Sequence, residues 1–220
     1  MKFFHVYNDE CFAGLEKNGM ITKLDCHVME LACKYISQHI DEEWFEGIVI
    51  SVNVSKVDLK LREFIEYYTN VRNKYDIPDN RIEIEFTESA VFEDYSIFKQ
   101  IMFELRKSGF YCSIDDFGTG FSSLNLLTDF MFDIVKLDKS FLDNIEKHNS
   151  GTDEIVVRNI VKMVSELKMK AIAEGVETEE QARFLKNIDC RLVQGYLFDK
   201  PLPVEDFVGR LQNRKYENDV

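Results

Sequence analysis

Two adjacent carboxylates, Asp115 and Asp116, stand between a β-prone segment and a turn that contains glycine. Adjacent carboxylates repel each other, and a divalent cation beside them is the simplest way to offset that repulsion. In the alternative interpretation, the two acids form a solvated turn that only caps the next helix. The rest of the chain decides between the two, because polar residues of the same kind recur along it.

Polar residues follow hydrophobic segments of strand length throughout the chain. These segments are 47–54, 81–87, 110–115, 132–137, 169–174 and 191–198, and helical patterns separate them at 57–75, 93–108, 122–128, 138–147, 152–168, 178–187 and 203–213. This alternation predicts an α/β fold, a TIM-like (β/α) barrel with a parallel sheet. The polar residues at the strand ends are Asn53, Glu85, Glu88, Asp115, Asp116, Lys136, Asp138, Glu174, Glu177 and Gln194. Since the carboxyl ends of barrel strands meet at one face, we expect these side chains to share a pocket.

The chemistry of this set is that of a hard metal ion. Carboxylate and amide oxygens suit Mg²⁺ or Mn²⁺ better than zinc. Two such ions roughly 3.5–4 Å apart form the usual clamp for in-line displacement at a phosphodiester, and the first acid of the adjacent pair, Asp115, is a natural bridge between them. Lys136 could orient or deprotonate the attacking water or stabilise charge on the phosphorane. The alternative for this lysine is an ordinary salt bridge in the barrel mouth.

Seven short motifs occur together in the order and spacing of a known family. They are Ser-Val-Asn-Val-Ser at 51–55, Glu-Ile-Glu-Phe-Thr-Glu-Ser at 83–89, Ile-Asp-Asp-Phe-Gly-Thr-Gly-Phe-Ser-Ser-Leu at 114–124, Val-Lys-Leu-Asp at 135–138, Ala-Glu-Gly-Val-Glu-Thr at 173–178, Val-Gln-Gly-Tyr-Leu-Phe at 193–198 and Lys-Pro-Leu-Pro at 200–203. With them, the chain resembles the EAL domain family from about residue 17 to residue 211. The resemblance implies a bacterial signalling protein that hydrolyses cyclic di-GMP to the linear dinucleotide pGpG.

The resemblance also implies a role for each residue of the set. Asn53, Glu85 and Asp115 would bind the first metal ion, and Asp115, with Asp116 alongside, would bridge to the second. Lys136 would act on the water as its orienting base, and Glu174 would complete the metal and water network. Glu88 would hold the loop 118–120, which in this family supports metal binding and dimer contacts. Glu177 and Gln194 would line the nucleotide site.

The chain departs from the family at its beginning. The Glu-Ala-Leu motif that gives the family its name is absent from the sequence. In the family its glutamate is a ligand of the first metal ion, and an arginine shortly after it contacts a substrate phosphate. A closed barrel takes roughly eight strands, whereas six are recognisable here. Residues 23–39 read as a helix, and residues 1–8 could form one strand at most.

Three explanations for the missing strands remain open. The chain could come from a longer sensor or cyclase fusion, it could be a truncated paralogue, or a partner chain could supply the missing wall. We expect one domain over 1–220, with an atypical or truncated start at 1–22 and a family-like core at 23–213. An open barrel edge promotes association, so we also expect a homodimer or a strand-exchanged oligomer.

Composition narrows the class of protein further. The formal net charge of −13 argues against binding a nucleic-acid polymer, which needs a basic face. No signal peptide and no membrane-spanning run is recognisable, so we expect a cytoplasmic protein without a membrane segment. The five cysteines form no Cys-x-x-Cys pair, and Cys26 and Cys33 share a helix face, as core thiols would.

Two functions remain in competition. In the first, the chain is a cyclic di-GMP phosphodiesterase that uses Mg²⁺ or Mn²⁺, impaired by the missing glutamate. In the second, it is a catalytically inactive EAL-like protein that binds cyclic di-GMP or a regulatory partner. A barrel acting on sugar phosphates is disfavoured, because its late loops would be expected to carry glycine-rich phosphate sites. The late loops of this chain carry Glu174, Glu177 and Gln194 instead.

Overall fold

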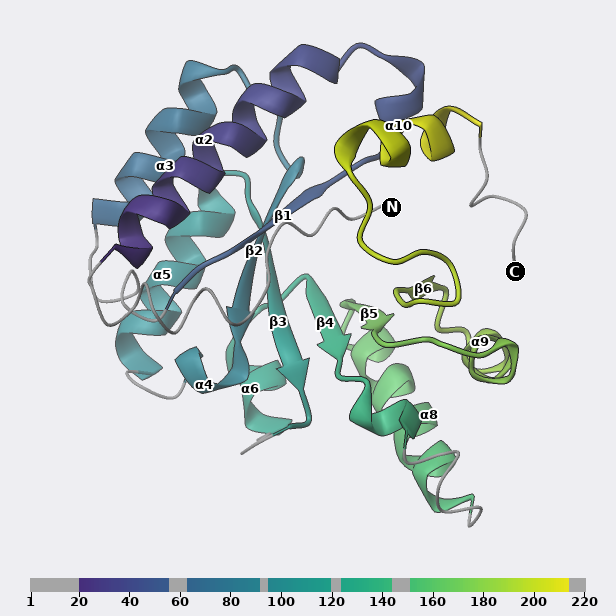
Figure 1. Ribbon diagram of the computed structural model, residues 1–220. Helices are drawn as coiled ribbons and strands as arrows, with labels where there is room; N and C mark the ends of the chain where they lie inside the picture. The colour runs from purple at the N-terminus through teal and green to yellow at the C-terminus, as the bar shows by residue number, and fades with distance from the viewer. Residues whose placement is uncertain (1–19, 56–62, 92–94, 120–123, 144–150, 214–220) are drawn as a thin grey trace. The chain divides into compact units, whose positions relative to one another are not determined.

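The computed structural model describes residues 20–55, 63–91, 95–119, 124–143 and 151–213 (Figure 1). The chain divides into two compact units, Met1–Ser113 and Ile114–Val220. Strands and helices alternate through both units, as the hydrophobic pattern predicts. The six strands follow one another in the sheet in chain order, from β1 to β6.

The first unit contains two parallel strands flanked by helices. Its elements are α2 (Ile21–His39), the short 3₁₀ helix η1 (Glu43–Phe45), β1 (Ile50–Asn53), α3 (Glu63–Lys74), β2 (Ile82–Thr87), α4 (Glu88–Val91), α5 (Tyr95–Lys107) and the beginning of β3 (Tyr111–Phe117). Strands β1 and β2 pair in parallel, with Ile50 opposite Ile82 and Asn53 opposite Glu85. Helix α2 packs against both α3 and β1 (Figure 1).

Both faces of the strands in the first unit are covered. Every residue of β2 from Ile82 to Phe86 is buried, which explains why the segment reads as a nearly continuous apolar run broken by two glutamates. Helices α3 and α5 each bury one stripe, of which Phe64 and Tyr68 on α3 and Phe98 and Leu105 on α5 are members. The helices therefore hold β2 and its carboxylates in a fixed place.

The second unit repeats the pattern with shorter strands. After the end of β3, its elements are α6 (Leu124–Asp129), β4 (Ile134–Leu137), a helix whose described part is Ser140–Asp143, α8 (Thr152–Glu166), β5 (Lys170–Ala173), α9 (Glu179–Asn187), β6 (Leu192–Val193) and α10 (Val204–Gln212). Strands β4, β5 and β6 pair in parallel, and α8 packs against β5.

Strand β6 is much shorter than the predicted segment 191–198. The chain turns at Gly195, because the Leu197 N–H donates to the Val176 carbonyl at 3.0 Å and the Phe198 N–H to the Gly195 carbonyl at 3.1 Å. Gly195 makes this turn possible, since a Cβ at that position would collide with the backbone of Val176. The apolar residues of 196–198 therefore belong to a turn and not to a strand.

The remaining predicted elements occur with shifted ends. The helix predicted at 23–39 begins at Ile21, and those predicted at 152–168 and 203–213 end two residues and one residue early. Parts of the patterns at 57–75, 93–108, 122–128 and 138–147 lie outside the described residues, as do the predicted N-terminal strand and the glycine-loop residue Gly120. None of the described helices is both long and apolar enough to cross a membrane.

Candidate active site

Strand β3 carries the two adjacent carboxylates directly before its last residue, Phe117. Asp115 is half-buried and Asp116 is exposed. Asp116 has a φ of 53°, a left-handed conformation that aspartate tolerates better than most residues. This geometry lets the Asp116 N–H donate to Asp115 Oδ1 at 3.0 Å, while the Asp116 carbonyl accepts from the Thr119 N–H and hydroxyl at 3.2 and 3.0 Å. The strand therefore stops with both side chains held at its carboxyl end.

The glycine after this strand is required by space as well as by conformation. Gly118 has a φ of 106°, and a Cβ there would collide with the ring of Phe141. Phe141 belongs to the helix that follows β4, whose first turn is capped by Asp138: its Oδ1 accepts from the Ser140 N–H at 2.9 Å. The turn after the carboxylates is thus packed against the helix that follows the strand of Lys136.

Lys136 lies in β4, where it pairs with Ile172 of β5. Its side chain is only 2% exposed. The ammonium Nζ lies 3.2 Å from Asp115 Oδ1 and 2.9 Å from Glu174 Oε1. A buried ammonium is costly unless it is paired, and these two carboxylates provide the pairing.

Glu174 follows β5 directly. Its backbone N–H donates to the Leu137 carbonyl at 3.0 Å, which extends the pairing of β4 with β5 by one residue. The next residue, Gly175, has a φ of 68°, and a Cβ there would collide with the side chain of Lys139. The chain can therefore turn sharply after Glu174, which keeps this carboxylate beside Lys136.

These residues form one cluster within the second unit. Asp115, Asp116 and Glu174 each offer a carboxylate oxygen, and the three oxygens lie within 4.8 Å of one another. Oxygens that share one Mg²⁺ or Mn²⁺ ion lie up to about 4.2 Å apart, twice the metal–oxygen distance. A small adjustment of side chains would therefore suffice. Three carboxylates beside one ammonium also leave an excess of negative charge, which a divalent cation would offset.

The first unit contains three of the predicted site residues. Asn53 ends β1 and lies opposite Glu85 in the parallel register, so the two side chains leave the sheet on the same face. Glu85 is buried, and so is Glu88, which begins α4 directly after β2. Hydrogen bonds or a cation must compensate carboxylates that are buried to this degree.

A buried acid in the first unit was not expected from the sequence. Asp25 of α2 is 3% exposed, and its Oδ2 accepts from the Ser55 N–H at 3.1 Å, two residues after Asn53. It therefore positions the backbone that leaves β1. The sequence pattern that could have predicted this burial is the position of Asp25 in the helix. It precedes the buried Val28 and Met29 by one turn and lies on the same face.

Glu177 and Gln194 have exposed side chains and lie beyond the ends of β5 and β6. Their backbones are well held. The Glu177 N–H donates to Gln181 Oε1 at 2.7 Å, next to the capping box that Thr178 and Gln181 form at the start of α9. The Gln194 N–H donates to the Ala173 carbonyl at 2.8 Å, so both residues stand at the carboxyl ends of strands.

Comparison with known proteins identifies the family. The EAL domain model matches residues 6–201. A signalling protein of Caulobacter vibrioides whose function is uncharacterised is 38% identical over 190 residues, which are 86% of this chain and 23% of that protein. The cyclic di-GMP phosphodiesterase NbdA of Pseudomonas aeruginosa is 36% identical over 195 residues, 88% of this chain and 24% of its own length.

Solved structures give the same result. The phosphodiesterase PaMucR in complex with cyclic di-GMP superposes with a TM-score of 0.82 at 31% identity, over 89% of this chain and 78% of that one. BlrP1 of Klebsiella pneumoniae, in complex with manganese and cyclic di-GMP, superposes with a TM-score of 0.73 at 29% identity, over 82% of this chain and 45% of that one.

This chain therefore belongs to the EAL domain family, as its motifs predict, and it has the α/β fold of those TIM-like barrel domains. It spans about a quarter to a third of the length of the curated relatives that it matches. In this chain Asp115, Asp116 and Glu174 form an acidic cluster that could hold a metal ion.

Proposed function

We propose that this chain is a metal-dependent phosphodiesterase domain that hydrolyses cyclic di-GMP to pGpG. The observation that carries the proposal is the position of Lys136, buried in β4 between Asp115 and Glu174. Its membership of the EAL family and its similarity to the phosphodiesterases NbdA and PaMucR support the choice of substrate.

The side chains divide the work in this proposal. Asp115, Asp116 and Glu174 would hold the divalent cations, and Asp115 would be a ligand of both. When bound, the cations polarise the phosphoryl oxygens and make the attacking water more acidic. Lys136 fixes the orientation of the water and balances the negative charge of the phosphorane. The water oxygen forms the new P–O bond, and the 3′ oxygen leaves with a proton.

Further assignments belong to the same proposal. Asn53 and Glu85 would be metal ligands, because they stand side by side at the ends of β1 and β2 with oxygen atoms that suit Mg²⁺ or Mn²⁺. Glu88 would support the glycine loop, and Glu177 with Gln194 would contact the nucleotide. We also expect a cytoplasmic location and a homodimeric or strand-exchanged assembly.

One observation favours a second function, binding without turnover. The chain has no Glu-Ala-Leu motif, so the first metal site lacks a carboxylate that the family normally provides. A water molecule can replace the geometry of that ligand but not its charge. Weakened metal binding would leave a protein that captures cyclic di-GMP and regulates a partner without hydrolysing it.

Chromatographic separation of pGpG from cyclic di-GMP tests the proposal. The chain is incubated with cyclic di-GMP and either Mg²⁺ or Mn²⁺, and we expect pGpG to accumulate with both ions. Calorimetric titration with cyclic di-GMP in Ca²⁺ accompanies the assay. Binding of cyclic di-GMP without formation of pGpG would mean that the chain is a binding protein and not an enzyme. If cyclic di-GMP is neither bound nor hydrolysed, the proposed substrate is wrong.

Two substitutions define the origin of any activity. Asp115→Ala should abolish pGpG formation, because it removes a ligand and a partner of Lys136. Asp153→Ala is the matched control, since this carboxylate lies in the first turn of α8 and outside the cluster. Equal activity in the two variants would show that the acidic cluster is not the active site.

A further inference from the structure

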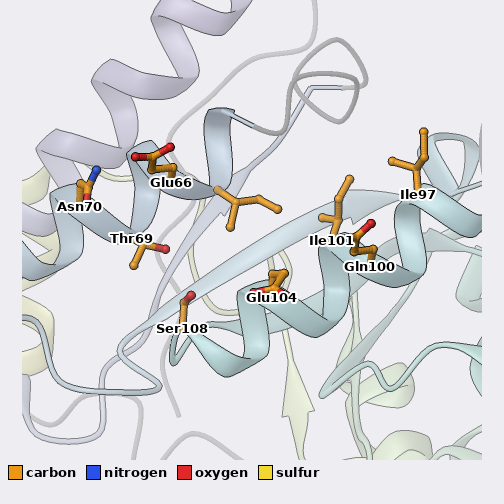
Figure 2. Close-up of a pocket in the computed structure, with 9 residues that line it drawn as sticks. Glu66, Thr69, Asn70, Ile97, Gln100, Ile101, Glu104 and Ser108 are labelled. Carbon is orange, nitrogen blue, oxygen red and sulfur yellow. The ribbon is translucent and has the colours of Figure 1, made fainter.

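A surface groove lies between α3 and α5 of the first unit, and its lining contains none of the predicted site residues. It has a volume of about 340 Å³ and is lined by residues of these two helices together with Ser108, which follows α5. Figure 2 shows the lining side chains along the two helices that border the groove. The volume is at the lower end of the range for small-molecule pockets.

Isoleucines, glutamates and uncharged polar residues line the groove. Ile65 of α3 and Ile97 and Ile101 of α5 provide the apolar surface, and Ile97 is 37% exposed. Glu66 and Glu104 add one carboxylate from each helix (Figure 2). Among the described residues, no lysine, arginine or histidine lines the groove, and neither glutamate forms a salt bridge with a described residue.

The spacing of the lining residues fits a helical occupant. On the α5 side, positions 97, 101, 104 and 108 recur at intervals of four, three and four, which is the spacing of a helix face that packs along another helix. Positions 65 and 69 of α3 are one turn apart on the opposite wall. A third helix laid along this trough could insert aliphatic side chains between the isoleucines.

Charge decides which helix this would be. The groove carries two carboxylates, and the chain as a whole has a net charge of −13. A second copy of this chain would bring a strongly acidic surface to an acidic groove, and like charges that face each other disfavour association. Lysine or arginine on either side of an aliphatic stripe would complement Glu66 and Glu104 instead.

We propose that the α3–α5 groove, with its isoleucines and the carboxylates Glu66 and Glu104, docks a basic amphipathic helix of a partner protein. The assignment is independent of the hydrolytic function, because none of the predicted metal ligands or nucleotide contacts lines the groove.

Fluorescence anisotropy with a defined peptide tests the docking. The probe is a fluorescein-labelled helical peptide of about 18 residues, built from alanine with a leucine stripe flanked by lysines. Its counterpart has glutamate in place of every lysine. At near-physiological ionic strength, the full chain should bind the lysine peptide and should bind the glutamate peptide about tenfold more weakly or worse. Equal binding of both peptides, or of neither, would overturn the proposal.

Charge-reversal variants locate the binding. The double variant Glu66→Lys with Glu104→Lys should weaken binding of the lysine peptide by about tenfold or more. The matched control is Glu179→Lys with Glu180→Lys, which reverses two exposed acids of α9. Circular dichroism verifies that both proteins are folded. Equal losses in the two double variants would mean diffuse attraction to an acidic protein and would contradict a specific groove.

Isoleucine methyl spectra provide a readout that charge alone would not change. Addition of the lysine peptide should shift the δ1 methyl signals of Ile65, Ile97 and Ile101, assigned by conservative Ile→Val variants. Ile155 on α8 is 61% exposed and lies in the other unit, so its signal should stay in place. Shifts centred on Ile155 would place the peptide elsewhere and overturn the assignment.

Discussion

At the scale of single residues, the account depends on how Lys136 is surrounded. A lysine with 2% of its side chain exposed is uncommon, and its ammonium has carboxylate oxygens of two different elements at 3.2 and 2.9 Å. These two contacts fit two interpretations of Lys136. In the first, the lysine forms an ordinary salt bridge that stabilises the barrel mouth; in the second, the carboxylates hold it in place to orient a water molecule. The two interpretations differ in what happens when the lysine is removed.

The variant Lys136→Ala separates them. We expect hydrolysis of cyclic di-GMP to fall by roughly 100-fold or more, because the group that orients the water is lost. We also expect Mn²⁺ affinity, measured by calorimetry, to stay the same or increase, since one positive charge leaves the cluster. Lys139→Ala is the control, an exposed lysine three residues further along. Undiminished turnover in a folded Lys136→Ala protein would leave only the structural role.

The buried thiols give a second test at this scale. Burial raises the pKa of Cys33 to about 12 and that of Cys190 to about 11. A thiol of pKa 11 has a thiolate fraction on the order of 10⁻³ near pH 8, and the fraction rises as the pH rises toward the pKa. In a Cys11→Ser background, we expect Ellman's reagent to react quickly with half-buried Cys26 alone.

Cys33, Cys112 and Cys190 are buried, so they should react only after the protein is unfolded in guanidinium. Adding Cys26→Ser should remove the fast phase and leave the slow one unchanged. Rapid reaction of several thiols in the native protein would contradict the packed cores around α2, β3 and β6.

At the scale of elements, the end of each strand determines where a functional side chain stands. The chain turns at or shortly after a carboxylate in two places. After Asp115, Asp116 adopts a left-handed conformation and Gly118 packs against Phe141; after Glu174, Gly175 packs against Lys139. The turns are therefore part of the site, although none of these glycines contributes a ligand.

Gly118→Ala tests this role. The new methyl group would meet the Phe141 ring at a backbone conformation that L residues rarely adopt, so we expect a loss of roughly 1–3 kcal/mol in the free energy of unfolding. Gly209→Ala is the matched control, because this glycine lies within α10 with open space around it. There alanine should increase stability by about 0.5–1 kcal/mol. Urea unfolding measures both, and equal effects would contradict the packing at Gly118.

Periodicity located the elements but not all of their ends. The apolar runs of β2 and β3 were recognisable because both strands are buried over nearly their whole length. The run at 191–198 looked equally like a strand, yet only Leu192 and Val193 are extended, because hydrogen bonds to Val176 from far along the chain bend the rest. Short pieces such as η1 and α4 were missed, since fewer than five residues show no period.

At the scale of the whole molecule, β3 connects the two compact units. Its residues Tyr111–Phe117 include Ser113, the last residue of the first unit, and Ile114, the first residue of the second. Cys112, in the first unit, and Phe117, in the second, are both buried. Because β3 belongs to both units, unfolding of one unit should also disrupt the part of β3 in the other.

If β3 couples the two units, urea unfolding curves recorded by two different probes should coincide. Trp44, the single tryptophan, lies in the first unit, so its fluorescence reports on that unit, whereas far-UV circular dichroism reports on helices of both. We expect the two signals to give the same urea midpoint within error. A tryptophan transition that clearly precedes the dichroism transition would mean that the units unfold independently.

The sequence predicted which residues form the candidate site better than it predicted how they are arranged in space. A polar residue after each hydrophobic run was enough to single out Asp115, Lys136 and Glu174, and the structure brings these three into direct contact. Asp25 escaped notice because an acid on a helix has no strand-end signal. The α3–α5 groove could not be predicted either. In the sequence, Glu66 and Glu104 read as ordinary solvated residues, and only the packing of α3 beside α5 places them in one groove.

A single-turnover time course shows whether this chain hydrolyses cyclic di-GMP. The chain, in excess over cyclic di-GMP, is mixed with Mn²⁺, and samples are quenched with EDTA and separated by chromatography. We predict that all of the cyclic di-GMP becomes pGpG and that EDTA added at the start prevents the conversion. Cyclic di-GMP that stays intact while bound to the folded, Mn²⁺-loaded chain would contradict the account and identify a binding protein.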